Sequence, residues 1–63
     1  NLVKNELIVA SQTSQKVTIY NSLGKRQMEI LLDAGTNSIS CDNLPNGIYI
    51  LSGANSNYKF IKQ

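Results

Sequence analysis

A chain of 63 residues with a net charge of +2 and 41% hydrophobic content forms one small domain at most, and a domain of this size buries only about 60% of its unfolded surface. The sequence contains no histidine, which removes the commonest general base and excludes a Ser-His-Asp triad within the chain. The six basic residues are scattered, whereas nucleic-acid binders show a clustered basic face with interleaved aromatic residues, so no nucleic-acid partner is expected. No transmembrane segment is expected either, because no apolar run approaches the roughly 18 residues that a membrane helix needs.

Short apolar–polar alternations separated by turn sequences predict six strands in chain order. They fall at residues 6–10, 16–21, 25–32, 37–41, 47–52 and 57–62. Turn signals recur about every ten residues, a spacing typical of an all-β chain. We therefore expect a small antiparallel immunoglobulin-like β-sandwich of about six to seven strands. A seventh strand would have to lie upstream of Asn1 or come from division of a longer segment.

The alternation also assigns side chains to faces, because successive residues of a strand point to opposite sides of a sheet. In the second, third and fourth predicted strands one alternate set is apolar and is expected to face the core, whereas in the fifth both sets are apolar. The expected core-facing sets are Val17 with Ile19, Met28 with Ile30 and Leu32, and Ile39 with Cys41. Cys41 is the only cysteine, so it is interpreted as a small core residue rather than a reactive thiol.

The most distinctive stretch runs from Leu44 to Leu51. Pro45 presets the φ angle of a turn, and Gly47 is able to adopt a positive φ. The run from Ile48 to Leu51 contains no polar group apart from the Tyr49 hydroxyl. Such a continuous apolar run predicts a central strand that is covered on both faces.

The sequence shows no set of residues typical of a catalytic or metal site, so no enzyme activity and no cofactor are expected. Four carboxylates are present, namely Glu6, Glu29, Asp33 and Asp42. Asp33 with Asn37, or Asp42 with Asn43, would place only one carboxylate in each loop. A calcium site needs several oxygen ligands that converge on one loop. Turn formation by Asx side chains explains these pairs better. The glycines are likewise spaced for turns rather than for phosphate binding.

The aromatic residues are Tyr20, Tyr49, Tyr58 and Phe60. Packing within the core or across strands is the simpler interpretation, and an exposed platform for a sugar ring is the alternative. The chain could accordingly be an immunoglobulin-like or fibronectin-like accessory module, carbohydrate-binding or a spacer, on an extracellular enzyme. An exposed last strand would also allow an edge-strand homodimer.

Four segments in this order carry a resemblance to a known family: Val17 to Lys25, Gly35 to Ile39, Leu44 to Leu51, and Tyr58 to Lys62. From about Glu6 to Lys62 the chain resembles the C-terminal sorting domain of the type IX secretion system of Bacteroidetes bacteria, the Por secretion type A family. It departs from the family in lacking an Asn-Pro-rich lead-in before the first strand.

The resemblance implies that residues 1–63 form a single C-terminal sorting domain, a piece of a longer secreted protein. Such domains fold in the periplasm and direct a cargo through an outer-membrane translocon to the cell surface or the extracellular space. A cell-surface sortase usually removes the domain. Gly47 and Tyr49 match the family's Gly-x-Tyr motif, and Lys59 and Lys62 match its terminal basic motif. These four residues are the candidates for recognition by the translocon.

Overall fold

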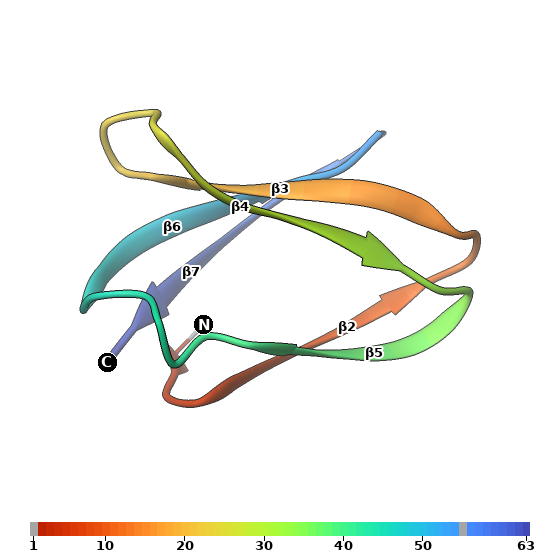
Figure 1. Ribbon diagram of the computed structural model, residues 1–63, viewed down its shortest axis with the longest axis horizontal. Helices are drawn as coiled ribbons and strands as arrows, with labels where there is room; N and C mark the ends of the chain where they lie inside the picture. Colours follow the sequence, from red (N-terminus) through yellow and green to blue (C-terminus); the bar gives the residue numbers. More distant parts are fainter. Residues whose placement is uncertain (1, 55) are drawn as a thin grey trace.

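The chain folds into two layers of β-strands that pack face to face, as the computed structural model of residues 2–54 and 56–63 shows (Figure 1). The strands of the described residues are β1 (Leu2–Val3), β2 (Glu6–Ser11), β3 (Gln15–Asn21), β4 (Arg26–Leu32), β5 (Gly35–Ser40), β6 (Gly47–Ser52) and β7 (Asn57–Lys62). One sheet has the order β1-β7-β6-β3-β4, and β2 and β5 form the other. The predicted all-β sandwich is confirmed.

The topology corresponds to that of an immunoglobulin domain. In that fold the C, F and G strands form one sheet, a C′ strand can extend it, and the B and E strands belong to the second sheet. Here β3, β6 and β7 take the places of C, F and G, β4 takes the place of C′, and β2 and β5 take those of B and E. No helix long and apolar enough to cross a membrane occurs in the described residues.

Strand β1 was not predicted. Leu2 and Val3 pair in parallel with Ile61 and Lys62 of β7, and the Gln63 amide donates a hydrogen bond to the Val3 carbonyl at 2.8 Å. The sequence predicted that a seventh strand would lie upstream of Asn1 or come from division of a longer segment. This expectation is wrong, because the seventh strand is Leu2–Val3. Two residues are too few to show a period-two pattern, and their partner is at the other end of the chain.

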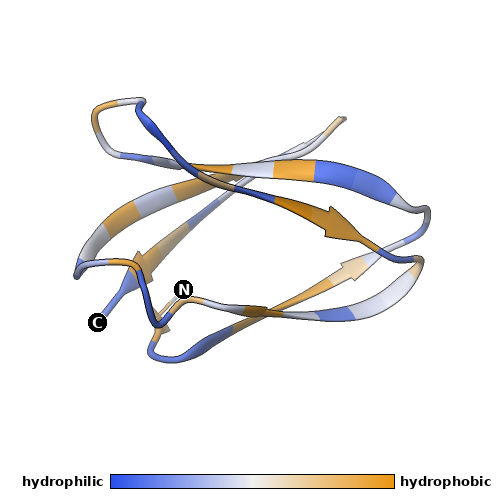
Figure 2. Ribbon diagram, viewed as in Figure 1, coloured by the Kyte–Doolittle hydropathy of each residue, from blue (hydrophilic) through white to orange (hydrophobic). Residues whose placement is uncertain are grey.

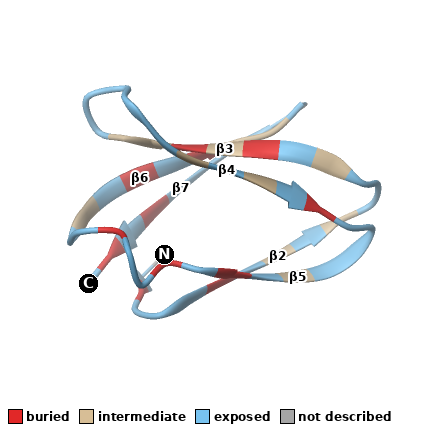
Figure 3. Cartoon of the chain, viewed as in Figure 1, coloured by how far each residue is buried: buried red, intermediate tan, exposed pale blue. Residues whose placement is uncertain are grey.

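The core lies between the two sheets and is built from alternate residues of the strands together with Cys41 and Leu44 of the β5–β6 connection. Figure 3 shows these buried positions recurring along strands of both layers. They are Val3, Leu7, Val17, Ile19, Leu32, Ile39, Cys41, Leu44, Tyr49, Leu51 and Phe60. Met28 and Ile30 pack against this cluster as partly buried side chains. The face assignments made from the sequence for β3, β4 and Ile39 with Cys41 are confirmed, and the same alternation is visible as changing hydropathy along the ribbon (Figure 2).

The turn between β3 and β4 is closed by backbone and side-chain bonds around Asn21. The Gly24 amide donates to the Asn21 carbonyl at 2.9 Å, and the Asn21 Oδ1 accepts hydrogen bonds from the amides of Leu23 and Lys25 at 3.0 and 2.9 Å. Gly24 completes the turn with φ of +84°. This left-handed conformation disfavours any residue that carries a Cβ.

Gly24→Ala is therefore expected to destabilise the domain by about 1–2 kcal/mol. The space around Gly24 is open, with no atom within 4 Å of the position that the alanine Cβ would take, so the backbone conformation alone causes the loss. Thermal unfolding followed by circular dichroism should show a melting temperature lower by roughly 4–8 °C per kcal/mol. Ser22→Ala in the same turn is the control and should shift it little, and an equal shift in both variants would contradict this origin.

Candidate recognition surface

The corner between β5 and β6 is fixed by the hydroxyl group of Tyr49. This hydroxyl donates a hydrogen bond to the Pro45 carbonyl oxygen at 2.6 Å, while only 4% of the Tyr49 residue is exposed. Leu44, just before Pro45, is buried, and its amide donates to the Cys41 carbonyl at 3.0 Å. The arrangement is similar to the tyrosine corner of immunoglobulin-like domains, in which a tyrosine near the start of strand F bonds the backbone a few residues upstream.

The ring of Tyr49 also packs on β7. Tyr49 is the cross-strand partner of Phe60, and the two rings stack with centroids 5.6 Å apart and an interplanar angle of 24°. Phe60 is fully buried. Offset stacking at this separation adds to the energy of burial, so Tyr49 joins the corner to the last strand.

Gly47 of β6 and Lys62 of β7 are cross-strand partners, two residues along from the pair of Tyr49 and Phe60 and on the same, core-facing side of the sheet. Gly47 has a φ of +158°, a positive value as expected from the sequence and one that residues with a Cβ rarely adopt. Lys62 is only 8% exposed, and its Nζ donates to the Gln63 carbonyl at 3.3 Å. Most of Lys62 is therefore covered by neighbouring residues rather than displayed on the surface.

Lys59 lies on the opposite side of the sheet. It pairs with Ile50 across β6 and β7 and is exposed. The structure thus brings all four predicted recognition residues onto two paired strands, but the pleat divides them. Lys59 points outward, whereas Gly47, Tyr49 and Lys62 have the register of the core-facing side.

A group of aliphatic residues on the outer side of the same strands is not predicted by the sequence. We call this group the outer apolar patch: Leu2, Ile48, Ile50 and Ile61. These residues are 60%, 44%, 38% and 40% exposed, respectively. The expectation that β6 is central is confirmed by the strand order, but the expectation that it is covered on both faces is wrong, because no described element covers its outer face. The continuous apolar run from Ile48 to Leu51 is the sequence signal for this patch, but the sequence interpretation assigns the run to burial on both faces.

The other candidate groups form no site. Asn37 closes the β4–β5 turn, because its Oδ1 accepts from the Asp33 amide and its Nδ2 donates to the Asp33 carbonyl, both at 2.9 Å. No cluster of three potential metal ligands and no pocket is present in residues 2–54 and 56–63. Tyr20 pairs with outward-facing Ile50, and Tyr58 pairs with buried Leu51. These two tyrosines therefore belong to opposite faces and form no common platform.

Cys41 is fully buried, which confirms its interpretation as a core residue. Its Sγ donates a weak hydrogen bond to the Ile39 carbonyl at 3.7 Å. Burial raises the pKa of the Cys41 thiol above its ordinary value of 9.0, and the charge of Lys62 opposes this effect. The thiol is therefore protonated and shielded in the folded domain.

A disulfide reagent at pH 8 is expected to label Cys41 at least about a hundredfold more slowly in the native domain than in urea, since an opening free energy of about 3 kcal/mol exposes about one molecule in a hundred. As the pH rises through 9.0, the Cys41 thiol of the unfolded chain loses its proton before the buried thiol of the folded domain does. The free energy of unfolding therefore decreases over this pH range. Rapid stoichiometric labelling of the native domain would contradict the burial.

Comparison with known proteins identifies one family. The model of the family described as secretion system C-terminal sorting domain matches residues 1–63. No curated protein and no solved structure matches the chain. The family match covers all seven strands and the four residues predicted from the resemblance.

Proposed function

The chain belongs to the family of secretion system C-terminal sorting domains, which are non-catalytic sorting signals for type IX secretion, and from this membership we propose that it works as a folded label at the C-terminal end of a longer secreted protein. The observation that carries the proposal is the family match to residues 1–63. Membership implies interaction with the type IX machinery and export to the cell surface or the extracellular space.

The packing of the domain supports a label that is bound in its folded state. The core is continuous between the sheets, and every buried side-chain nitrogen and oxygen among the described residues has a hydrogen-bond partner. A partner therefore gains contact only with outward-facing side chains and with sheet edges. In our proposal the domain folds in the periplasm, binds outer-membrane components of the machinery, and is removed from its cargo by a cell-surface sortase.

We propose two different roles for the four motif residues. Lys59, which is exposed, contacts the machinery directly. Gly47, Tyr49 and Lys62 shape the β6–β7 surface from the core side, and Tyr49 does so through its bond to Pro45. Substitution of the buried members would then impair export by way of the fold.

A further proposal concerns self-association through the last strand. Strand β1 pairs only with Ile61 and Lys62 of β7, so the outer edge of β7 over residues 57–60 has no strand partner among the described residues. Unpaired strand edges readily pair with another chain. A homodimer formed at this edge would be detected by light scattering over a range of concentrations, and a constant monomer mass would contradict it.

The proposed function is tested by fusing a reporter protein to the N-terminal side of residues 1–63. In a type IX-competent bacterium the reporter should appear at the cell surface or in the medium. The matched control is the same fusion in a strain without a functional type IX system, where the reporter should stay in the periplasm. Periplasmic retention in the competent strain, with the domain folded, would overturn the proposal.

A further inference from the structure

The outer apolar patch is continuous across three strands because the register aligns its members. Leu2 pairs with Ile61, and Ile61 pairs with Ile48, so these three side chains form one row across β1, β7 and β6. Ile50 lies two residues further along β6 on the same face. Tyr20 of β3 borders Ile50 on the other side and is half-buried.

Other exposed aliphatic side chains lack such neighbours. Ile8 is 61% exposed on the outer face of the two-stranded sheet, where its cross-strand partner is Ser38. Glu6 shares that face and accepts a hydrogen bond from the Ser38 hydroxyl at 2.7 Å. Leu31 is 79% exposed at the edge strand β4, opposite Lys16. Isolated exposed aliphatics are common on soluble proteins, whereas a contiguous group marks an interaction site.

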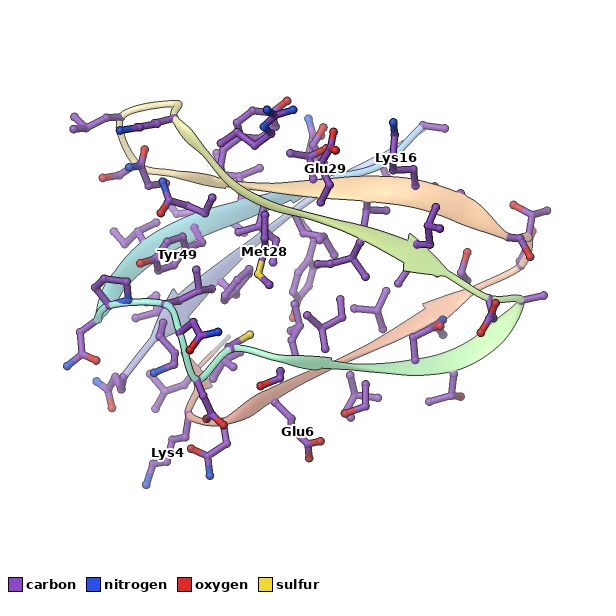
Figure 4. All side chains as sticks on the ribbon, viewed as in Figure 1. Lys4, Glu6, Lys16, Met28, Glu29 and Tyr49 are labelled. Atoms are coloured by element: carbon purple, nitrogen blue, oxygen red, sulfur yellow. The ribbon has the colours of Figure 1, made fainter. Side chains whose placement is uncertain are left out.

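The charge next to the patch is positive. Lys59 lies across from Ile50, and among the described residues its side chain forms no hydrogen bond or ion pair, since the ion pair present joins Arg26 to Glu29. The nearest pair of opposite charges, Arg26 with Glu29 at 3.2 Å, lies on the edge strand β4. Figure 4 shows Glu29 and Lys16 pointing away from the two-stranded sheet, while Met28 and Tyr49 point between the layers.

This distribution favours a partner other than a second copy. Two copies packed through the patch would bury two sets of aliphatic residues and bring Lys59 of each near the interface. The patch itself contains no carboxylate, and Glu29, which lies on the same face at the edge strand β4, is already paired with Arg26. Uncompensated like charges at an interface oppose association. A complementary surface instead presents apolar side chains together with an acidic group that faces Lys59.

We propose that the outer apolar patch and Lys59 form the surface by which the domain docks onto a protein component of the type IX machinery, one that offers apolar side chains and a carboxylate. This inference rests on the proposed function and adds the face that is recognised. It also assigns direct contact to the alternate residues Ile48 and Ile50 of the Gly-x-Tyr region, while Gly47 and Tyr49 hold that strand in place.

The test compares export of the reporter fusion for four sequences. Ile50→Ser with Ile61→Ser, and separately Lys59→Glu, should lower the exported fraction by roughly tenfold or more, as the loss of a central interface contact does. The matched controls are Ile8→Ser with Leu31→Ser, and Lys16→Glu, which make the same chemical changes elsewhere. These controls should be exported within about twofold of the unchanged chain.

Melting temperatures of the purified domains separate recognition from folding. Lys59→Glu lies at an exposed position, so it should fold normally even if the double serine variant is less stable. Export of folded Lys59→Glu and double serine variants at the level of the controls would overturn the inference while leaving the proposed function intact. Failure of the unchanged chain to be exported would overturn both.

A photoreactive phenylalanine at position 50 identifies what covers the patch in the competent bacterium. The expected product joins the domain to an identified protein of the type IX machinery, and the same group at position 8 should not form it. Crosslinks from position 50 that lead only to a second copy of the domain, or only to lipid, would overturn the inference.

Discussion

Replacement of Phe60 by alanine is expected to remove a large part of the free energy of unfolding of the domain. The Phe60 side chain is fully buried between the sheets and stacks on Tyr49. Loss of such a side chain costs about 3–5 kcal/mol, because apolar contacts disappear and a cavity remains. A domain of this size has a total stability of only roughly 3–9 kcal/mol. One substitution therefore removes much or all of the net stability.

Urea titration followed by circular dichroism would measure this loss, and the dispersion of amide signals in an NMR spectrum would show whether a unique fold remains. The matched control is Lys59→Ala, the neighbouring residue on the same strand with its side chain outward. It should change the free energy of unfolding by no more than about 0.5 kcal/mol. Equal effects of the two substitutions would mean that β7 does not have the register observed here.

Most of the fold could be predicted because its strands carry their pattern within a few residues. The alternation of Val17 with Ile19, or of Met28 with Ile30, arises from one sheet face turned to the core. Strands β6 and β7 have the predicted bounds, and the other predicted strands differ by one or two residues at their ends. The pairing of Leu2–Val3 with β7 could not be predicted, since it depends on contact between the two ends of the chain.

The surface was harder to predict than the core. A strand with apolar residues on both sides is compatible with burial on both sides or with burial on one side and exposure on the other. Ile48 and Ile50 belong to the second case. Likewise, the sequence presents Lys59 and Lys62 as equivalent basic residues, whereas the pleat exposes the first and encloses the second. Only the register and the order of the strands resolve these choices.

A consequence follows for any export experiment on this domain. Substitutions at Phe60 or Tyr49 act on the core, and substitutions at Lys59 or Ile50 act on the outer face. Both kinds can lower the amount of exported cargo. Stability has to be measured for each variant before an export defect is attributed to recognition, and Tyr49 is the residue for which this distinction matters most.

Tyr49→Ala is expected to destabilise the domain by about 3–5 kcal/mol, since it removes both the stacked ring and the bond to Pro45. Tyr49→Phe keeps the ring and removes only the hydroxyl, so it should cost about 0.5–1.5 kcal/mol. Tyr58→Phe is the matched control, because the Tyr58 hydroxyl forms no hydrogen bond within the described residues. Urea titration should order the losses as Tyr49→Ala, then Tyr49→Phe, then Tyr58→Phe. A control loss as large as that of Tyr49→Phe would contradict a specific role of the corner bond.

Export of the Tyr49→Phe variant then separates the two roles that a motif tyrosine can have. In the folded domain only 4% of Tyr49 is exposed, and its hydroxyl is bonded to the Pro45 carbonyl, so a partner gains little direct contact with this residue. A loss of about 1 kcal/mol still leaves most molecules folded, and export should accordingly remain close to that of the unchanged chain. Strongly reduced export of a folded Tyr49→Phe domain would show that the machinery contacts the hydroxyl in an opened state, and it would contradict recognition through the outer face of the intact sandwich.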